Sequence, residues 1–498
     1  MQLHRIPRLA ALLAVASSCT ATCSSADLRQ VLLDDANNWS ASTVISFPDD
    51  PAAFLNATQR WSPFMVPTYE AAITPGTEED VAKAVSLAAK HGVGFLATGG
   101  RHGYGTSMSA LEDGLAIDLS LLRSVVVDSD AATLTIGGGT RAADILGPVS
   151  QAGFELQIGS CSCPGLVGLT VGAGINHWQG VHGMVLDALV SARVVTASGE
   201  IVEASESVNA DLFWALRGAG ANFGIITSAT YRLHPQTNNN EILVVDVTFP
   251  AAAAEEYYAA LEQISQNQPA ELSYMSMVLW NQTDNAPMLV GDFIYLGPRE
   301  VGLELLAPIL DLGPTIRLVN VAGWRQIFQV ALLGSDARSC IPGSVHTPYN
   351  TAVRNFSLPS LVRSFHVLSD LWAEFPGTRA TGFTYQRPGQ GAAQAVPNDA
   401  TAYAWRDAEA YMLAQFSFPL GDVAAQAAVD EAGKKIRADF AQTSGYGGLA
   451  VYVNSARGDE TLEQIFGRDK LPRLAEAKRR WDPTNAFKYM HAIPTQYP

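Results

Sequence analysis

Cysteines, charged residues and long apolar stretches are all scarce in this chain of 498 residues. Charged residues make up only 16% and hydrophobic residues 48%, a balance that excludes an intrinsically disordered protein. No apolar stretch reaches the roughly 20 residues of a membrane-spanning helix, which excludes a multi-span membrane protein. The net charge of −16 argues against a nucleic-acid partner, because binding phosphates requires a basic surface. These properties leave a large, acidic, globular protein with room for two or three domains.

The few cysteines do not form a recognisable disulfide framework or zinc site. Cys19 and Cys23 lie within or beside an N-terminal signal. Cys161 and Cys163 are too close in sequence to bridge each other without strain, and Cys340 is distant from both. A zinc site would need a second Cys/His pair, so we expect no metal. Another role for Cys161 or Cys163 therefore has to be considered.

Residues 1–24 have the pattern of a secretory signal peptide. Arg5 and Arg8 precede a short apolar run, and small residues follow it. The alternative is a frayed amphipathic helix. If the chain is secreted, four Asn-X-Ser/Thr triplets are candidate N-glycosylation sites in exposed loops. These triplets begin at Asn38, Asn56, Asn281 and Asn355.

The rest of the chain changes character after His234-Pro235. Residues 70–235 alternate strand and helix patterns, including a helix over 81–91 that Thr77 can cap and Gly92 ends. Residues 241–420 carry long strands separated by helices, which predicts an α+β fold with a mainly antiparallel sheet.

Smaller features of the second half are also predicted. Strands are expected over 242–249 and 410–418, and residues 387–400, rich in Gly, Ala, Gln and Pro, are expected to form an exposed loop. From Leu462 onward the pattern is helical.

Two glycine-rich stretches, over residues 98–107 and 159–183, suggest a binding site. Glycines allow backbone N–H groups to approach a phosphate or a ring without a Cβ in the way. Neither stretch matches a Walker loop or a nicotinamide fingerprint. Each contains a reactive side chain, His102 in the first and Cys161 with Cys163 in the second, which favours a chemical role over simple turns.

Taken together, the motifs resemble those of FAD-linked oxidases of the vanillyl-alcohol oxidase type, in the berberine-bridge-enzyme-like branch. They are Ala72-Ile73-Thr74-Pro75, Gly99-Gly100-Arg101-His102-Gly103, Gly159-Ser160-Cys161-Ser162-Cys163-Pro164, Asp211-Leu212-Phe213-Trp214 and Asp482-Pro483-Thr484-Asn485. The resemblance implies a two-lobed PCMH-type FAD-binding domain over 25–238, completed by residues 449–498. A substrate domain over 239–448, an antiparallel sheet covered by helices, would be inserted between them.

The resemblance also assigns roles in FAD binding. His102 matches the histidine that bonds the flavin C8α methyl group, although an alignment without a gap from Asp118 would place Arg101 there. Arginine cannot make that bond, so His102 is preferred. Cys161 matches the cysteine that bonds flavin C6, with Cys163 as the second choice.

The remaining FAD contacts implied by the resemblance are mainly backbone groups of the glycine loops, with Ile226 near the adenine. They are Thr98, Gly99, Gly100, Arg101, Gly103, Gly159, Ser160, Gly165, Gly172, Ile226 and Asn485. The small side chain at Gly159 leaves room for oxygen to reach the flavin, which favours an oxidase that makes hydrogen peroxide.

The catalytic base departs from the family pattern. The family's glutamate position, shortly before the strand expected over 402–406, falls on Ala395. Tyr452, in a segment like the family's Tyr-x-Asn beside the flavin, is an alternative base if a nearby positive charge lowers its pKa. Glu409 and Tyr411 are expected on one strand face together with Tyr403.

The segment Trp405-Arg406-Asp407 is expected to close the domain interface with a buried ion pair.

Overall, the sequence predicts a secreted FAD-dependent oxidase that takes a hydride from a small organic substrate and passes the electrons to oxygen. The substrate is expected to be an alcohol, an amine or an activated C–H compound of secondary metabolism. A carbohydrate oxidase acting at an anomeric hydroxyl and a redox-silent cyclase stay open as alternatives, as does a secreted binding protein.

Overall fold

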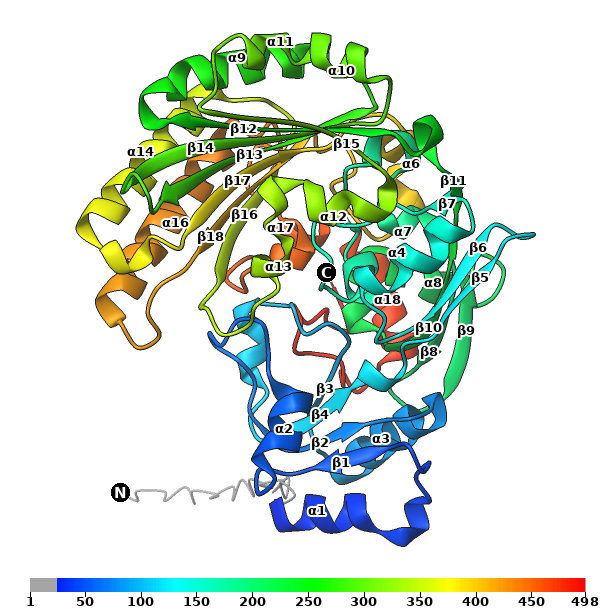
Figure 1. Cartoon of the computed structure of the whole chain (residues 1–498). Helices are drawn as coiled ribbons and strands as arrows, with labels where there is room; N and C mark the ends of the chain where they lie inside the picture. Colours follow the sequence, from blue (N-terminus) through cyan, green and yellow to red (C-terminus); the bar gives the residue numbers. More distant parts are fainter. Residues whose placement is uncertain (1–24, 498) are drawn as a thin grey trace, which may run out of the picture.

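The computed structural model describes residues 25–497 and places three large sheets in two parts of the molecule. The predicted signal peptide, with Cys19 and Cys23, lies outside the described residues. Figure 1 shows the seven-stranded sheet with its helices at one end and the two smaller sheets at the other. Within residues 25–497, no helix is both long enough and apolar enough to cross a membrane.

The first lobe is a four-stranded sheet covered by the helices of the N-terminal region. In spatial order its strands are β1 (Val44–Ser46), β2 (Tyr69–Thr74), β4 (Gly114–Asp118) and β3 (Phe95–Thr98). The helices here are α1 (Ser25–Leu33), α2 (Pro51–Thr58) and α3 (Glu78–His91). The predicted helix is confirmed: Thr77 Oγ1 accepts the N–H of Asp80, and Gly92 ends α3 with φ +67°. The apolar face of α3 packs on the sheet, so the loop that follows β3 starts from a rigidly packed part of the lobe.

The second lobe is a five-stranded antiparallel sheet. In order its strands are β5 (Val125–Asp128), β6 (Thr133–Gly137), β10 (Ile225–Arg232), β8 (Leu189–Val195) and β9 (Ile201–Ser205), and β7 (Phe154–Glu155) pairs separately with β11 (His234–Pro235). Its helices are α4 (Ala142–Gln151), α5 (Leu166–Val171), α6 (Gln179–His182), α7 (Val185–Ala188) and α8 (Ala210–Ala219). The second glycine stretch runs between α4 and α7 and is therefore anchored in the core of this lobe.

The third sheet has seven strands, all antiparallel. In order they are β15 (Ile316–Ala322), β12 (Ile242–Pro250), β14 (Ala286–Tyr295), β13 (Leu272–Asn281), β17 (Gly382–Arg387), β18 (Ala410–Phe416) and β16 (Thr347–Val353). The helices of this part are α9 (Ala254–Gln266), α10 (Arg299–Leu305), α11 (Ala307–Leu310), α12 (Ile327–Val330), α13 (Asp336–Ser339), α14 (Leu358–Glu374), α15 (Ala392–Ala395) and α16 (Val423–Thr443). Apolar side chains of one sheet face pack against α9, α14 and α16, so the opposite face points toward the other two lobes (Figure 1).

The C-terminal segment returns to the N-terminal half of the chain. Helices α17 (Leu462–Phe466) and α18 (Leu471–Trp481) contribute apolar residues to the core of the second lobe. Lys478, fully buried, donates from Nζ to Asp482 Oδ2 (2.6 Å) and to the Asn222 carbonyl (2.8 Å). The predicted α+β architecture with an antiparallel sheet is thus confirmed, whereas the domain boundaries at 238/239 and 448/449 stay predictions.

One local expectation holds in part and one was wrong. Within residues 387–400, Arg387, Pro388 and Gly389 are buried and the short helix α15 follows, whereas most residues from 394 to 399 are exposed as predicted. Gly389 packs so closely on Ala270 that a Cβ would lie 2.0 Å from the Ala270 carbonyl oxygen. Residues 402–406 do not form a strand, because their backbone bonds go to the end of α8, where Tyr403 N donates to Arg217 O.

Candidate active site

The two glycine loops cross each other backbone to backbone. A Cβ on Gly100 would lie 2.1 Å from Gly165 N, and one on Gly165 would lie 2.7 Å from Gly100 N. Any other residue would therefore push the loops apart. The contact brings together two segments that are about sixty residues apart in sequence, as the FAD-site prediction requires.

Backbone N–H groups in both loops are left available. Among the described residues, no backbone or side-chain acceptor takes the N–H groups from Gly100 to Gly105 or those from Gly159 to Cys161. These segments are partly or fully buried, so the amides are sheltered from bulk solvent. Successive free amides favour anionic groups, so the loops fit a dinucleotide phosphate. Both the missing Cβ atoms and the free donors agree with an FAD-binding role.

His102 lies on the first loop, at the start of an aromatic stack. Its ring stacks on Trp61 with centroids 5.2 Å apart, and Trp61 stacks on His346 with centroids 3.9 Å apart. Burial, followed by the positive charges of Arg141 and Arg60, lowers the pKa of His102 to about 4. The imidazole is therefore neutral at pH 7 and has a free lone pair.

Two arginines support the first loop. Arg60 is buried and donates from Nη2 to the Gly103 carbonyl at 2.8 Å, while its Nη1 has no partner among the described residues. Arg101 has φ +59°, a left-handed conformation, and its guanidinium donates to the Asn56 carbonyl. The Arg101 side chain is thereby tied to the segment of Asn56, and His102 as the attachment residue stays a prediction.

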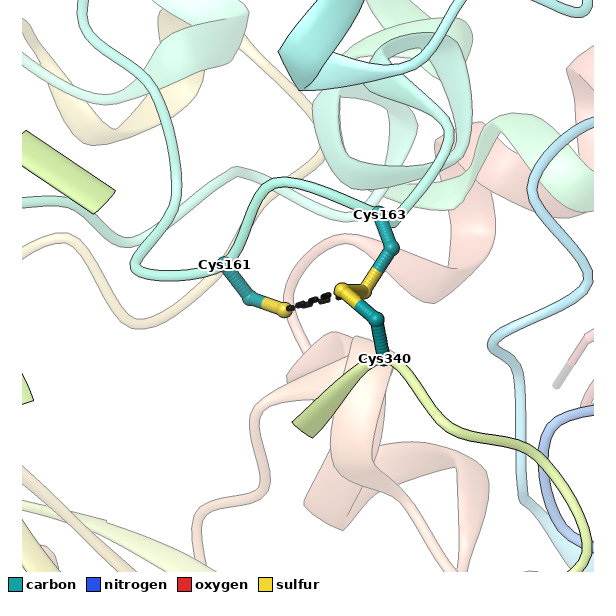
Figure 2. Close-up of side chains that lie close together, drawn as sticks. All are labelled: Cys161, Cys163 and Cys340. Carbon is teal, nitrogen blue, oxygen red and sulfur yellow. Dashed lines mark hydrogen bonds between the residues drawn. A yellow bond between two sulfur atoms is a disulfide. The ribbon is translucent and has the colours of Figure 1, made fainter. Parts of the chain in front are cut away.

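The second loop contains a disulfide that the sequence did not predict. Cys163 is bonded to Cys340, 177 residues away, and Cys161 is the free cysteine of residues 25–497 (Figure 2). Cys163 therefore loses its place as the second choice for flavin attachment, because its sulfur is already bonded. Cys161 Sγ lies 3.1 Å from Cys163 Sγ and 3.9 Å from Cys340 Sγ.

Asp336 holds the tip of the second loop from the other side. Ser162 donates to it from both its backbone N (2.9 Å) and its Oγ (2.6 Å). Burial, together with the negative charge of Asp336, raises the pKa of Cys161 to about 11. Cys161 is therefore a protonated thiol at neutral pH.

Tyr452 lies against the second glycine stretch, but its electrostatics differ from the prediction. Its Oη accepts hydrogen bonds from Asn454 Nδ2 (2.9 Å) and Ile175 N (3.5 Å). Burial raises the pKa of Tyr452 to about 12, and no positive charge counters it. The condition attached to this prediction, a nearby positive charge that lowers the pKa of Tyr452, is therefore not met. Gly172 makes room for this arrangement, since a Cβ there would lie 2.0 Å from Asn454 Oδ1.

The other predicted polar residues are arranged differently from the strand prediction. Tyr403 lies outside β18, yet its hydroxyl donates to Tyr411 Oη at 3.3 Å. Glu409 pairs instead with Arg387 at 2.9 Å. The expected buried ion pair is present, with Asp187 as the partner of Arg406 at 2.7 Å. Asp407 is more exposed and contacts Tyr446.

The inner face of the seven-stranded sheet carries uncharged residues beside the loops. Met277, Thr384 and Leu413 are cross-strand neighbours on β13, β17 and β18, and all three are half-buried, unlike their fully buried neighbours along each strand. Gln415, on the same face, contacts His346 Nδ1 at 3.2 Å. This contact links the sheet to the aromatic stack of His102.

The remaining predicted residues are placed as follows. The Ile226 carbonyl oxygen lies beside Gly138, where a Cβ would be 2.3 Å from it, and Asn485, with φ +53°, has a buried Oδ1 without a partner among the described residues. Thr98 ends β3. Of the triplet asparagines, Asn38, Asn56 and Asn355 are exposed and Asn281 is half-buried.

Sequence reasoning missed Trp61, His346, Asp336 and the pairing of Cys340. None of these residues belongs to a local motif, and each reaches the loops only through the tertiary fold. Cys340 alone gave a signal, as the one cysteine far from the others.

Comparison with known proteins agrees with the geometry. Residues 69–205 match the family described as FAD binding domain, and residues 451–494 match the family described as berberine and berberine like. The FAD-linked oxidoreductase fogF of Aspergillus ruber is 43% identical over 484 residues, covering 96% of this chain and 97% of that protein. The FAD-linked oxidoreductase OXR1 of Pyricularia oryzae is 43% identical over 458 residues, covering 92% and 90%.

Solved structures show the same fold at low identity. BBE-like 1 of Physcomitrella patens superposes with a TM-score of 0.81 at 22% identity, covering 95% of this chain and 100% of that one. Glucooligosaccharide oxidase of Acremonium strictum, described with a 6-S-cysteinyl, 8α-N1-histidyl FAD, gives a TM-score of 0.79 at 24% identity, covering 92% and 98%.

Proposed function

Because the chain belongs to the berberine-bridge-enzyme-like FAD-linked oxidoreductases, we propose that it oxidises a small, neutral organic molecule and uses oxygen as the electron acceptor. FAD, held by the two glycine loops, would supply the hydride acceptor, and oxygen would take up the electrons and form hydrogen peroxide. An alcohol, an amine or an activated C–H compound fits the patch formed by Met277, Thr384 and Leu413, which carries no charge to pair with an ionic substrate. The two carboxyl groups on the same sheet face, those of Asp246 and Asp292, are buried and accept backbone N–H groups of Leu333 and Leu332.

We further propose that His102 and Cys161 both hold the flavin covalently. One observation carries this: the two residues stand on loops that cross at Gly100 and Gly165, and Cys161 is the sulfur left free by the disulfide. His102 is neutral and ready to act as a nucleophile, whereas Cys161 has to lose a proton first. The described attachment in glucooligosaccharide oxidase is a precedent within the same fold.

Tyr452 is proposed to take the proton of the substrate hydroxyl. The two N–H donors at its Oη stabilise a phenolate there, while burial opposes it and keeps the free enzyme protonated at neutral pH. The active form, with Tyr452 as a phenolate, is then a minor population, and it increases about tenfold for each unit by which the pH rises toward about 12.

The experiment begins with protein made through a eukaryotic secretory route. The acid-denatured pellet is digested and flavin is located by mass, and oxygen uptake and hydrogen peroxide are measured with neutral alcohols, amines and oligosaccharides. Flavin on the His102 and Cys161 peptides with peroxide from a neutral alcohol or amine supports the proposal. Product without oxygen uptake would favour the cyclase, and peroxide from sugars alone would favour the carbohydrate oxidase.

Tyr452→Phe tests the base. The wild-type kcat/KM for an alcohol should rise with pH, and Tyr452→Phe should abolish that slope and lower kcat/KM by about 10²–10⁴-fold, the usual contribution of a general base. Tyr403→Phe is the matched control, since it removes a buried hydroxyl that bonds only to Tyr411. An unchanged slope in Tyr452→Phe rules out this role.

Secretion and glycosylation stay part of the proposal. Exposed Asn38, Asn56 and Asn355 and the disulfide support an extracellular route, because disulfides persist in oxidising compartments. A mass decrease on treatment with an N-glycosidase would test it, and no change would count against it.

A further inference from the structure

Three sulfur atoms meet beside the second glycine loop, and only two of them are bonded. The Sγ atoms of Cys161, Cys163 and Cys340 all lie within 4.8 Å of one another (Figure 2). Cys161 Sγ lies 3.1 Å from Cys163 Sγ and 3.9 Å from Cys340 Sγ, beside the disulfide and not in line with it. To attack Cys340, the Cys161 side chain has to rotate into line with the Cys163–Cys340 bond. A bond between Cys161 and Cys163 is disfavoured, because the two residues are only two positions apart.

The structure holds Cys340 firmly in this position. Two buried aspartates, directly opposite each other on β12 and β14, anchor the preceding segment: Asp292 Oδ2 accepts Leu332 N (2.8 Å) and Asp246 Oδ2 accepts Leu333 N (2.9 Å). Asp336 then fixes the segment to Ser162, the residue between the two loop cysteines. Cys340 is therefore held close to both loop cysteines, bonded to Cys163 and 3.9 Å from the sulfur of Cys161.

We propose that Cys161 and Cys163 compete for Cys340, so that the loop has two disulfide isomers and only one of them leaves Cys161 free. The interconversion is thiol–disulfide exchange. The Cys161 thiolate attacks Cys340 Sγ, the Cys161–Cys340 bond forms, the Cys163–Cys340 bond breaks, and Cys163 leaves as a thiolate that takes up the proton Cys161 lost. No external oxidant or reductant is consumed.

This competition gives Cys163 a positioning role. By occupying Cys340, it keeps Cys161 reduced and out of a disulfide, as the proposed flavin attachment requires, and this part of the inference rests on the proposed function. The raised pKa of Cys161 slows the exchange at neutral pH, because only the thiolate attacks. The Cys163–Cys340 isomer is thus preserved once the protein has folded.

Cys163→Ser is the decisive variant. The full-length protein is trapped in acid with N-ethylmaleimide, digested without reductant and mapped by mass. Most chains should show a Cys161–Cys340 crosslink and carry no flavin on Cys161. Cys340 found as the maleimide adduct, with Cys161 free or flavin-bound, would overturn the proposal. Cys161→Ser is the control and should keep the Cys163–Cys340 crosslink.

A second measurement applies if Cys163→Ser does not fold. Wild-type protein from riboflavin-limited cells, whose Cys161 carries no flavin, is incubated at about pH 9.5 and mapped in the same way. The rate at which the Cys161–Cys340 crosslink forms should increase about tenfold for each pH unit up to that pH, because the rate follows the fraction of Cys161 thiolate. A crosslink map that stays entirely Cys163–Cys340 contradicts the proposal.

These readouts separate the two ideas. If wild-type protein never carries flavin on Cys161, the proposed bicovalent attachment fails while the crosslink map still tests the exchange. If Cys163→Ser keeps Cys161 flavinylated and Cys340 as a thiol, the exchange fails while the attachment stands.

Discussion

The two glycine loops bury their reactive side chains to a similar degree and with opposite chemical results. Burial is the main cause of both shifts: it lowers the pKa of His102 to about 4 and raises that of Cys161 to about 11. A neutral imidazole is the reactive form of histidine, whereas a neutral thiol is the unreactive form of cysteine. The same loss of solvent therefore prepares one residue and restrains the other.

The two loops are also held in place by different kinds of interaction. The first loop is held by packing, through Trp61 and the carbonyl bond from Arg60 to Gly103. The second is held by a covalent bond and by Asp336, whose charge adds to the restraint on Cys161. We infer that attachment at His102 needs no further activation, while attachment at Cys161 depends on removing a proton.

The largest expected effect comes from breaking both loops at once. In Gly100→Ala the new methyl group would collide with Gly165 N, so the loops should separate and bound FAD should be lost, with about 1–3 kcal/mol of stability. Flavin absorbance and thermal unfolding measure the two effects. Gly147→Ala in α4 is the control, because no atom lies within 4 Å of its Cβ, and it should retain FAD with a stability change within about 1 kcal/mol. Normal FAD content in Gly100→Ala would show that the crossing does not matter.

The contrast between the loops also shows which features a sequence can predict. Local signals were sufficient for α3, whose cap at Thr77 and stop at Gly92 lie within the helix ends, and for the glycines around His102. The pairing of Cys163 with Cys340 depends on how the chain folds across 177 residues, and spacing alone does not encode that.

The pKa values were similarly out of reach of the sequence. Tyr452 was predicted as a base on the condition that a positive charge lowers its pKa, but its pKa is set mainly by burial, which is a property of the assembled lobes. The stacking of Trp61 on His346 joins the loop before β2 to the residue before β16 and leaves no motif in either segment.

An intermediate effect should appear in the pH dependence of labelling. In FAD-free protein, alkylation of Cys161 by iodoacetamide should accelerate about tenfold per pH unit from roughly pH 7 to 10, because the thiolate fraction grows up to its pKa. Modification of His102 by diethyl pyrocarbonate should stay flat from roughly pH 6 to 8, since the imidazole is already neutral. Peptide mass mapping follows both sites in one sample. A plateau for Cys161 below about pH 9 would remove the contrast.

The smallest expected effect tests how much the charge of Asp336 contributes to the raised pKa of Cys161. Asp336→Asn removes a negative charge near Cys161 and keeps one acceptor oxygen for Ser162, so the pKa of Cys161 should fall and its alkylation at about pH 8 should become a few-fold faster. Burial, the larger cause, is unchanged, which is why the effect stays modest. Asp311→Asn, an exposed carboxylate elsewhere, should leave the rate unaltered. Slower alkylation of Cys161 in Asp336→Asn, with the Cys163–Cys340 crosslink intact, would contradict this. It would mean that Asp336 acts on the conformation of the loop, and that burial alone keeps the Cys161 thiol protonated.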